Sequence, residues 1–312
     1  MTSTARRVTL SVAVVAALTG VAACGSSGSG KGDGKASGDS TVHLSPVAAV
    51  LRSVQQSTDK ADSAKVRADI SMGDVMKLTE NGSFDWSDGL KGNVTVDYTG
   101  GKMAEMMSKA GGSSMAIRYL QDGYYAKMSD NFARQAGGGK HWIKYDYDYL
   151  AKAGGASGVF TKEQLQSSTP NQSVKVLLAS GDVKEVGRQT VDGTPTRHYA
   201  GTVDVAALAG RTSNLTATQL SELKQQLTKS GITTETVDIW INDQNLLVKQ
   251  SVKAATANGT LTTTAHYSDY GVPVSAEAPP ASDTLDIADM MKSAGVDSPS
   301  GGTTSGGTGL TS

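Results

Sequence analysis

The chain has 312 residues, enough to bury a sizeable apolar core, and its 29 basic and 30 acidic side chains give a formal net charge of −1. This balance, without a basic run, excludes a protein that binds nucleic acid through a positively charged patch. The single cysteine excludes a fold that depends on internal disulfides.

The first 23 residues have the layout of a signal peptide. Arg6 and Arg7 precede an apolar stretch, residues 8–20, whose 13 residues are too few for a membrane-spanning helix of about 20. The arginine pair fits either the general secretory or the twin-arginine export route. We therefore expect export, with residues 1–23 removed.

Val21-Ala22-Ala23-Cys24 resembles the bacterial lipobox. The resemblance implies that Cys24 becomes the N-terminal residue and the lipid attachment site, an N-palmitoyl and S-diacylglycerol cysteine. Two or more acyl chains hold a protein stably on a membrane. The sequence thus predicts a protein anchored by lipid to the extracytoplasmic face of the cell membrane.

Composition marks the limits of the folded part. Residues 24–41 comprise the cysteine and a glycine- and serine-rich segment, which predicts a flexible tether of roughly 20–25 Å root-mean-square span. Residues 296–312 are rich in Gly, Ser and Thr and have too little apolar surface to repay the entropy of ordering, so a disordered tail is expected. A single domain is predicted between them, at 42–295.

In chain order, the first half of this domain reads as one helix followed by strands. Ser45-Pro46 is typical of a helix start, and apolar residues follow it at helical spacing. Apolar residues then alternate in 66–72, 82–86 and 90–98, which predicts strands with one buried face. A hairpin is expected where 115–120 and 124–129 flank an Asp-Gly turn, and a short helix at 173–180.

The second half shows the same kinds of sequence pattern. A turn at 191–193 leads into a strand, Thr216 and Gln219 have the spacing of a capping box, and Gly231 is placed to end the helix. Alternating segments at 235–241, 246–257 and 260–271 then predict further strands. A sheet that is apolar on one face must bury that face, so the order indicates an α+β fold: a curved antiparallel sheet with helices on one side.

The run from Ser173 to Pro279 resembles a known family. SVKVLLASGDVKEVGRQTVDGTPTRHYAGTVDVAAL, VDIWINDQNLLVKQS and AHYSDYGVPVSAEAP are similar to the LppX/LprA/LprF/LprG-type lipoproteins of actinobacteria, which belong with the LolA/LolB-like lipoprotein carriers. The segment around Trp142 is similar too. The resemblance implies an antiparallel β half-barrel closed by helices around an apolar cavity that binds or carries acyl lipid.

Catalytic motifs are not evident in the sequence. The four histidines lack metal-ligand spacing, and the one serine pattern near a nucleophile elbow, Gly25–Gly28, lies in the tether. GGGKH at 137–141 lacks the remainder of a phosphate loop. Asp146 and Asp148 fit a solvated pair better than an acid–base pair. We therefore expect no enzyme activity, no catalytic residue, no metal and no cofactor.

The function expected is that of an envelope lipoprotein that binds or carries an acyl lipid or another hydrophobic ligand. The alternative is a structural or sensory lipoprotein whose domain is filled by its own side chains and which binds a protein partner. The methionines at 103, 106, 107 and 115 fit either an adaptable apolar surface or a core. The residues expected to line the cavity lie on apolar strand faces: Phe84, Trp86, Val94, Val96, Ile117, Tyr119, Ile239 and Ile241.

Overall fold

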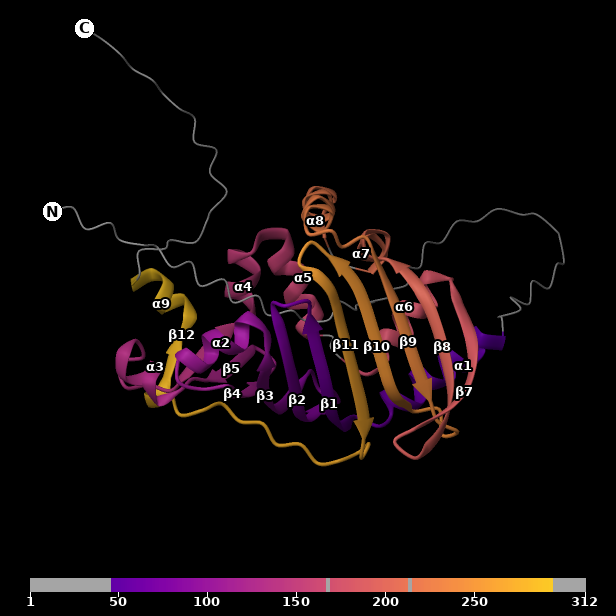
Figure 1. Ribbon diagram of the computed structural model, residues 1–312, viewed down its shortest axis with the longest axis horizontal. Coiled ribbons are helices and arrows are strands. Elements are labelled where there is room, and N and C mark those ends of the chain that lie inside the picture. The colour runs from indigo at the N-terminus through magenta and orange to yellow at the C-terminus, as the bar shows by residue number, and fades with distance from the viewer. Residues whose placement is uncertain (1–45, 167–168, 213–214, 294–312) are drawn as a thin grey trace, which may run out of the picture.

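The structure is a computed structural model that describes residues 46–166, 169–212 and 215–293 (Figure 1). The predicted signal peptide, Cys24, the tether and the C-terminal tail lie outside the described residues. Among the described helices, none has both the length and the apolar character needed to cross a membrane.

Twelve strands form one sheet in the order β12-β6-β5-β4-β3-β2-β1-β11-β10-β9-β8-β7. Figure 1 shows the strands curving across the molecule from β12 to β7. All neighbours pair antiparallel except β12, which pairs parallel with β6. The predicted α+β class with a curved antiparallel sheet is therefore confirmed. The strands are β1 (Ser63–Met72), β2 (Met76–Asp85), β3 (Lys91–Gly100), β4 (Ser114–Tyr119), β5 (Gly123–Lys127), β6 (Trp142–Asp146), β7 (Val183–Val191), β8 (Thr194–Asp204), β9 (Thr234–Ile241), β10 (Leu247–Thr256), β11 (Gly259–Ser268) and β12 (Thr284–Asp286).

Helices fill the connections between strands. The predicted first helix begins at Pro46, and the predicted capping box between Thr216 and Gln219 is present at the start of α8. The α-helices are α1 (Pro46–Asp59), α2 (Gly101–Lys109), α3 (Asp130–Gln135), α4 (Tyr147–Ala153), α5 (Gly155–Gln166), α6 (Asn171–Ser180), α7 (Val205–Thr212), α8 (Ala217–Lys229) and α9 (Ile287–Ser293), and one 3-10 turn, η1, spans Ala281–Asp283.

The alternation in the strands gives the sheet two different faces. In β1, Ala64, Ala68 and Ile70 are buried, whereas Lys65 and Asp69 between them are exposed. Successive side chains of a strand point to opposite faces, so the apolar set faces the helices. We call this helix-covered side the inner face and the opposite side the outer face.

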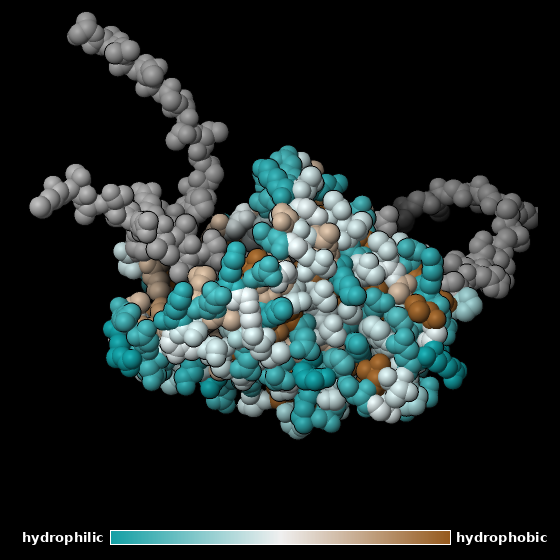
Figure 2. All heavy atoms as spheres, in the orientation of Figure 1, coloured by the Kyte–Doolittle hydropathy of each residue, from teal (hydrophilic) through white to brown (hydrophobic). Residues whose placement is uncertain are grey.

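The outer face is mostly polar. In the view of Figure 1, which looks onto the strands, the surface is mainly teal and white with small, separate brown areas (Figure 2). The chain after β11 also crosses this face. Asn93 Nδ2 donates to Ser275 O at 2.6 Å and Arg118 Nη1 donates to Glu277 O at 3.0 Å. This segment ends in β12, which covers the edge of β6.

Candidate ligand site on the inner face

The two halves of the inner face are packed differently. Over β8–β10, helices α1 and α6 complete a core in which Leu51, Val174, Tyr199 and Ile239 have no solvent exposure. We call this region the closed half. Its side chains fill the space between helix and sheet, as in an ordinary protein interior.

Over β2–β6 the apolar side chains are only partly covered. A buried cluster that includes Val94, Val96 and Tyr124 forms the base, and half-buried side chains pack on it. We call these half-buried side chains the open patch: Val75, Phe84, Tyr98, Met103, Met115, Tyr119, Tyr145, Leu150 and Leu261. Here the inner face keeps apolar and aromatic surface that solvent can reach.

Beside the open patch, the register of neighbouring strands places short alanine side chains and one glycine on the inner face. Ala265, Ala68 and Glu80 lie opposite one another on three successive strands, followed by Val96 and Met115 on β3 and β4. In the next row, Gly82 lies between Val66 and Val94. A Cβ atom at Gly82 would lie 2.1 Å from Asn93 O, so no side chain can rise there.

Aromatic rings contact one another along this part of the inner face. Phe84 and Tyr119 have ring centroids 5.4 Å apart, and Tyr119 lies 5.9 Å from Tyr124. Tyr124 in turn stacks on Tyr145 at 4.7 Å. Such contacts fix large apolar surfaces in place at small entropic cost.

Glu80 is an ionisable side chain among the apolar residues of this part of the sheet. It is half-buried on the inner face of β2, between Leu78 and Gly82. Burial raises its pKa to about 7. Its neighbours on the same face of β2, Leu78 and Phe84, are apolar.

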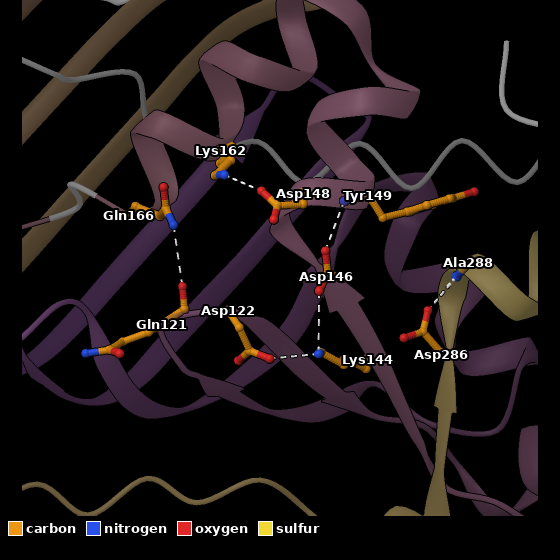
Figure 3. A network of polar contacts seen from close by, with 10 residues as sticks. All are labelled: Gln121, Asp122, Lys144, Asp146, Asp148, Tyr149, Lys162, Gln166, Asp286 and Ala288. Carbon is orange, nitrogen blue, oxygen red and sulfur yellow. Dashed lines mark hydrogen bonds and ion pairs between the residues drawn. The ribbon is translucent and has the colours of Figure 1, made fainter. Parts of the chain in front are cut away.

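Polar contacts fasten α4 and α5 beside the open patch (Figure 3). Lys144 Nζ lies 2.7 Å from Asp122 Oδ2 and 3.5 Å from Asp146 Oδ2. Asp146 also accepts from the backbone N–H of Tyr149 at 3.0 Å, which caps α4. The start of α4 is therefore fixed to the end of β6.

The same network extends to the next helix (Figure 3). Asp148 pairs with Lys162 of α5, and Gln166 Nε2 donates to Gln121 O at 3.4 Å. The sequence indicated a solvated pair for Asp146 and Asp148. Asp148 is exposed, as that interpretation expects, whereas Asp146 is half-buried and caps α4.

A small pocket lies below this hairpin. It has a volume of about 120 Å³ and is lined by Gly89, Leu90, Leu120, Gln121, Tyr147 and Gln166. Sites for small molecules typically occupy about 300–1,000 Å³. This pocket is therefore too small for a whole acyl lipid, and the ligand-sized apolar cavity implied by the resemblance stays a prediction.

The structure separates the eight predicted lining residues into four groups. Phe84 and Tyr119 belong to the open patch, and Val94, Val96 and Ile117 form the base beneath it. Ile239 and Ile241 lie in the closed half, with no solvent exposure. Trp86 lies beyond the end of β2, where its ring packs edge-on against Tyr270 at 6.4 Å.

Sequence reasoning missed the polar part of the site. Glu80 occupies an even-numbered position in β2, with Met76, Leu78 and Phe84 on the same face. The alternation of β2 therefore places a carboxyl group on an apolar strand face, and this placement could have been predicted from the sequence.

Two histidines on strands each have one acidic partner. His198 Nε2 lies 2.7 Å from Asp238 Oδ1, and His266 Nδ1 lies 2.6 Å from Asp192 Oδ2. Across the described ranges, His, Cys, Asp and Glu do not come together in groups of three that could hold a metal.

Two curated proteins of Streptomyces are similar to the chain over most of their length. A Streptomyces griseus protein named for its 31.2 kDa mass and its place in the rplA-rplJ intergenic region is 51% identical over 252 residues, which span 80% of this chain and 82% of the relative. A Streptomyces coelicolor protein, whose name describes it as a candidate lipoprotein, is 41% identical over 308 residues, which span 94% of this chain and 99% of the relative. The chain belongs to the same family as these two proteins.

Two further comparisons concern the structure and the family models. The Mycobacterium tuberculosis lipoprotein LppX is similar to it in structure, with a TM-score of 0.46 and 13% identity, covering 74% of this chain and 98% of LppX. LppX is one of the lipoproteins that the sequence resembles. No family model matches the chain.

Proposed function

We propose that this protein is an extracytoplasmic lipoprotein, anchored through Cys24, that binds or carries a hydrophobic ligand with acyl chains on its inner face. The observation that carries the ligand-binding proposal is the open patch. Its aromatic and methionine side chains stay half-buried, although the same sheet buries equivalent side chains completely in the closed half. The anchor rests on the lipobox resemblance and on the name of the Streptomyces coelicolor relative.

An acyl chain suits this surface for a physical reason. Each methylene removed from water gains about 0.8 kcal/mol, and the thioethers of Met103 and Met115 adapt to chains of varied shape. Binding and carriage by this route need no catalytic residue.

A second candidate function is that of a lipoprotein that binds a protein partner and holds no ligand. The small volume of the pocket below α4 and α5 favours it, as does the complete packing of the closed half. The two candidates differ in whether the purified protein carries or takes up lipid.

A pair of neighbouring substitutions tests the ligand-binding proposal. Met115 is half-buried on the inner face of β4, whereas Ser114 beside it is exposed. The full chain is purified in mild detergent, noncovalent lipid is counted by native mass spectrometry, and uptake of a fluorescent acyl probe is titrated. We expect Met115→Asp to weaken probe uptake by at least about tenfold, because the new carboxylate must be desolvated against the acyl chain.

Ser114→Asp is the control, because it adds the same charge one residue away on the side facing solvent, and it should bind as the wild type does. Melting curves of both variants show whether a loss of binding follows from a loss of fold. A wild-type chain that carries no lipid and takes up no probe would leave the protein-binding candidate in its place.

A further inference from the structure

Tyr147, at the start of α4, has a buried hydroxyl group with an unused donor. The side chain is 2% exposed, and its Oη atom has no hydrogen-bond partner among the described residues. The residue is held firmly, because its backbone N–H donates to Asp122 O at 3.0 Å and its ring lies 6.3 Å from that of Tyr124. Buried polar groups normally have partners, so an unused donor in such a place indicates a bound group.

The same tyrosine lines the pocket below α4 and α5. The other lining residues are Gly89, Leu90, Leu120, Gln121 and Gln166. An apolar cavity of about 150 Å³ is large enough to bind benzene. The volume of about 120 Å³ therefore suits one functional group of a ligand, with a few heavy atoms.

The two glutamine amides of this pocket are already engaged. Gln121 Nε2 donates to Asp88 O, and Gln166 Nε2 donates to Gln121 O at 3.4 Å, a contact that Figure 3 shows. Both glutamines are exposed, so water satisfies their remaining donors and acceptors. The hydroxyl of Tyr147 is thus the buried polar group that the pocket offers to a ligand.

The pocket borders the open patch. Leu120 directly follows Tyr119 of the open patch in the chain. The ring of Tyr119 lies 5.9 Å from that of Tyr124, against which Tyr147 packs. A ligand chain on the open patch therefore has its nearest buried donor in this pocket.

We propose that the Tyr147 pocket holds the carbonyl group of a neutral ester whose acyl chain lies over the open patch. This inference rests on the proposed function, since it names the class of ligand for the same surface. The phenol O–H donates to the carbonyl oxygen, and Leu90 and Leu120 contact the alkyl parts of the ester.

Charge excludes other lipid end groups from this pocket. The six residues that line it carry no formal charge, so the carboxylate of a fatty acid would lose its hydration without gaining a cation. Burial and the negative charge of Asp122 both raise the pKa of Tyr147, so its phenol stays a neutral donor. An alkylammonium group has no acceptor for that donor.

A competition experiment with the full chain tests the subsite. Methyl dodecanoate, dodecanoate and tetradecane, an alkane of the same chain length as the ester, each displace the fluorescent acyl probe at pH 8. In wild type we expect the ester to compete at a concentration at least about tenfold below that of the carboxylate. Tyr147→Phe should weaken the ester by at least about fivefold without weakening the alkane, because only the ester uses the hydroxyl.

Tyr199→Phe is the matched control, because it also removes a buried phenol hydroxyl, but in the closed half. It should leave the ratio of ester to alkane as in wild type. Tyr147→Phe should also melt no lower than wild type, since the lost hydroxyl has no partner among the described residues. A purely structural role of this hydroxyl would lower the melting temperature instead.

Leu120→Phe keeps the test valid if Tyr147→Phe fails to fold. The larger side chain takes up part of the pocket, so it should weaken the ester more than the alkane.

The outcomes separate this inference from the proposed function. If the wild type takes up no probe, the proposed function fails. If it takes up the probe but Tyr147→Phe leaves the ratio of ester to alkane unchanged, the pocket holds only water, so the subsite is wrong and the proposed function stands. A wild-type preference for the carboxylate over the ester also overturns the subsite.

Discussion

Glu235 holds a carboxyl group in the interior at 3% exposure, on the inner face of β9 beside Val203 and Ala254. Burial raises its pKa from 4.5 to about 7. Between these two values the folded protein keeps a proton that the unfolded chain has lost. Stability must therefore fall as pH rises from about 4.5 to about 7 and stay lower above that range.

The expected loss at Glu235 is on the order of 3 kcal/mol, since one pKa unit corresponds to about 1.4 kcal/mol. Glu235→Gln mimics the protonated form, so we expect the variant to be more stable than wild type at pH 8 and to differ little at pH 4.5. Urea unfolding across this range measures the effect. Glu222→Gln, on the exposed face of α8, should run parallel to wild type, and a wild-type stability that is flat from pH 5 to 8 would contradict the prediction.

At the scale of an element, two acidic residues near the start of α4, Asp146 and Asp148, are expected to contribute differently to its stability. Asp146 caps the helix and lies 3.5 Å from Lys144, whereas Asp148 is exposed and pairs only with Lys162. Loss of a helix cap costs about 0.5–2 kcal/mol. We therefore expect Asp146→Ala to lower the free energy of unfolding by about 1–2 kcal/mol.

Asp148→Ala is the control for this prediction, because exposed ion pairs contribute little. Its midpoint in urea should be close to that of wild type. Equal effects of the two substitutions would show that the Asp146 cap does not hold α4 in place.

The elements themselves were largely readable from the sequence. The Asp-Gly hairpin between β4 and β5, the Thr216 capping box and the alternating strands of the second half depend on neighbouring residues, and all are present. The parallel pairing of β12 with β6 was not predictable, because it joins segments about 140 residues apart and β12 has only three residues.

At the scale of the whole molecule, the proposed lipid anchor at Cys24 is the feature that sets where the domain works. Cys24 lies outside the described residues, so the assignment rests on the sequence. We expect Cys24→Ala to release the protein from membranes or to block its processing, because a chain without acyl groups has nothing to hold it there. Fractionation of cells with immunoblotting measures the release, and the mass of the mature chain measures the processing.

The melting temperature of the Cys24→Ala chain should match that of wild type, because the sequence places the cysteine in the predicted tether and starts the predicted domain at residue 42. A variant that sediments with membranes as fully as wild type and matures to the same mass would show that Cys24 is not the anchor.

The sequence by itself determined the features that depend on neighbouring residues: the lipobox resemblance, the strand alternation and the helix caps. It could not determine which apolar strand face would be covered. Ile239 and Phe84 have the same alternating pattern, yet α1 and α6 bury the first and no helix fully covers the second. Tertiary structure also placed Trp86 against Tyr270. The reason is physical: periodicity fixes the face on which a side chain lies, whereas coverage depends on register and helix packing between segments distant in sequence.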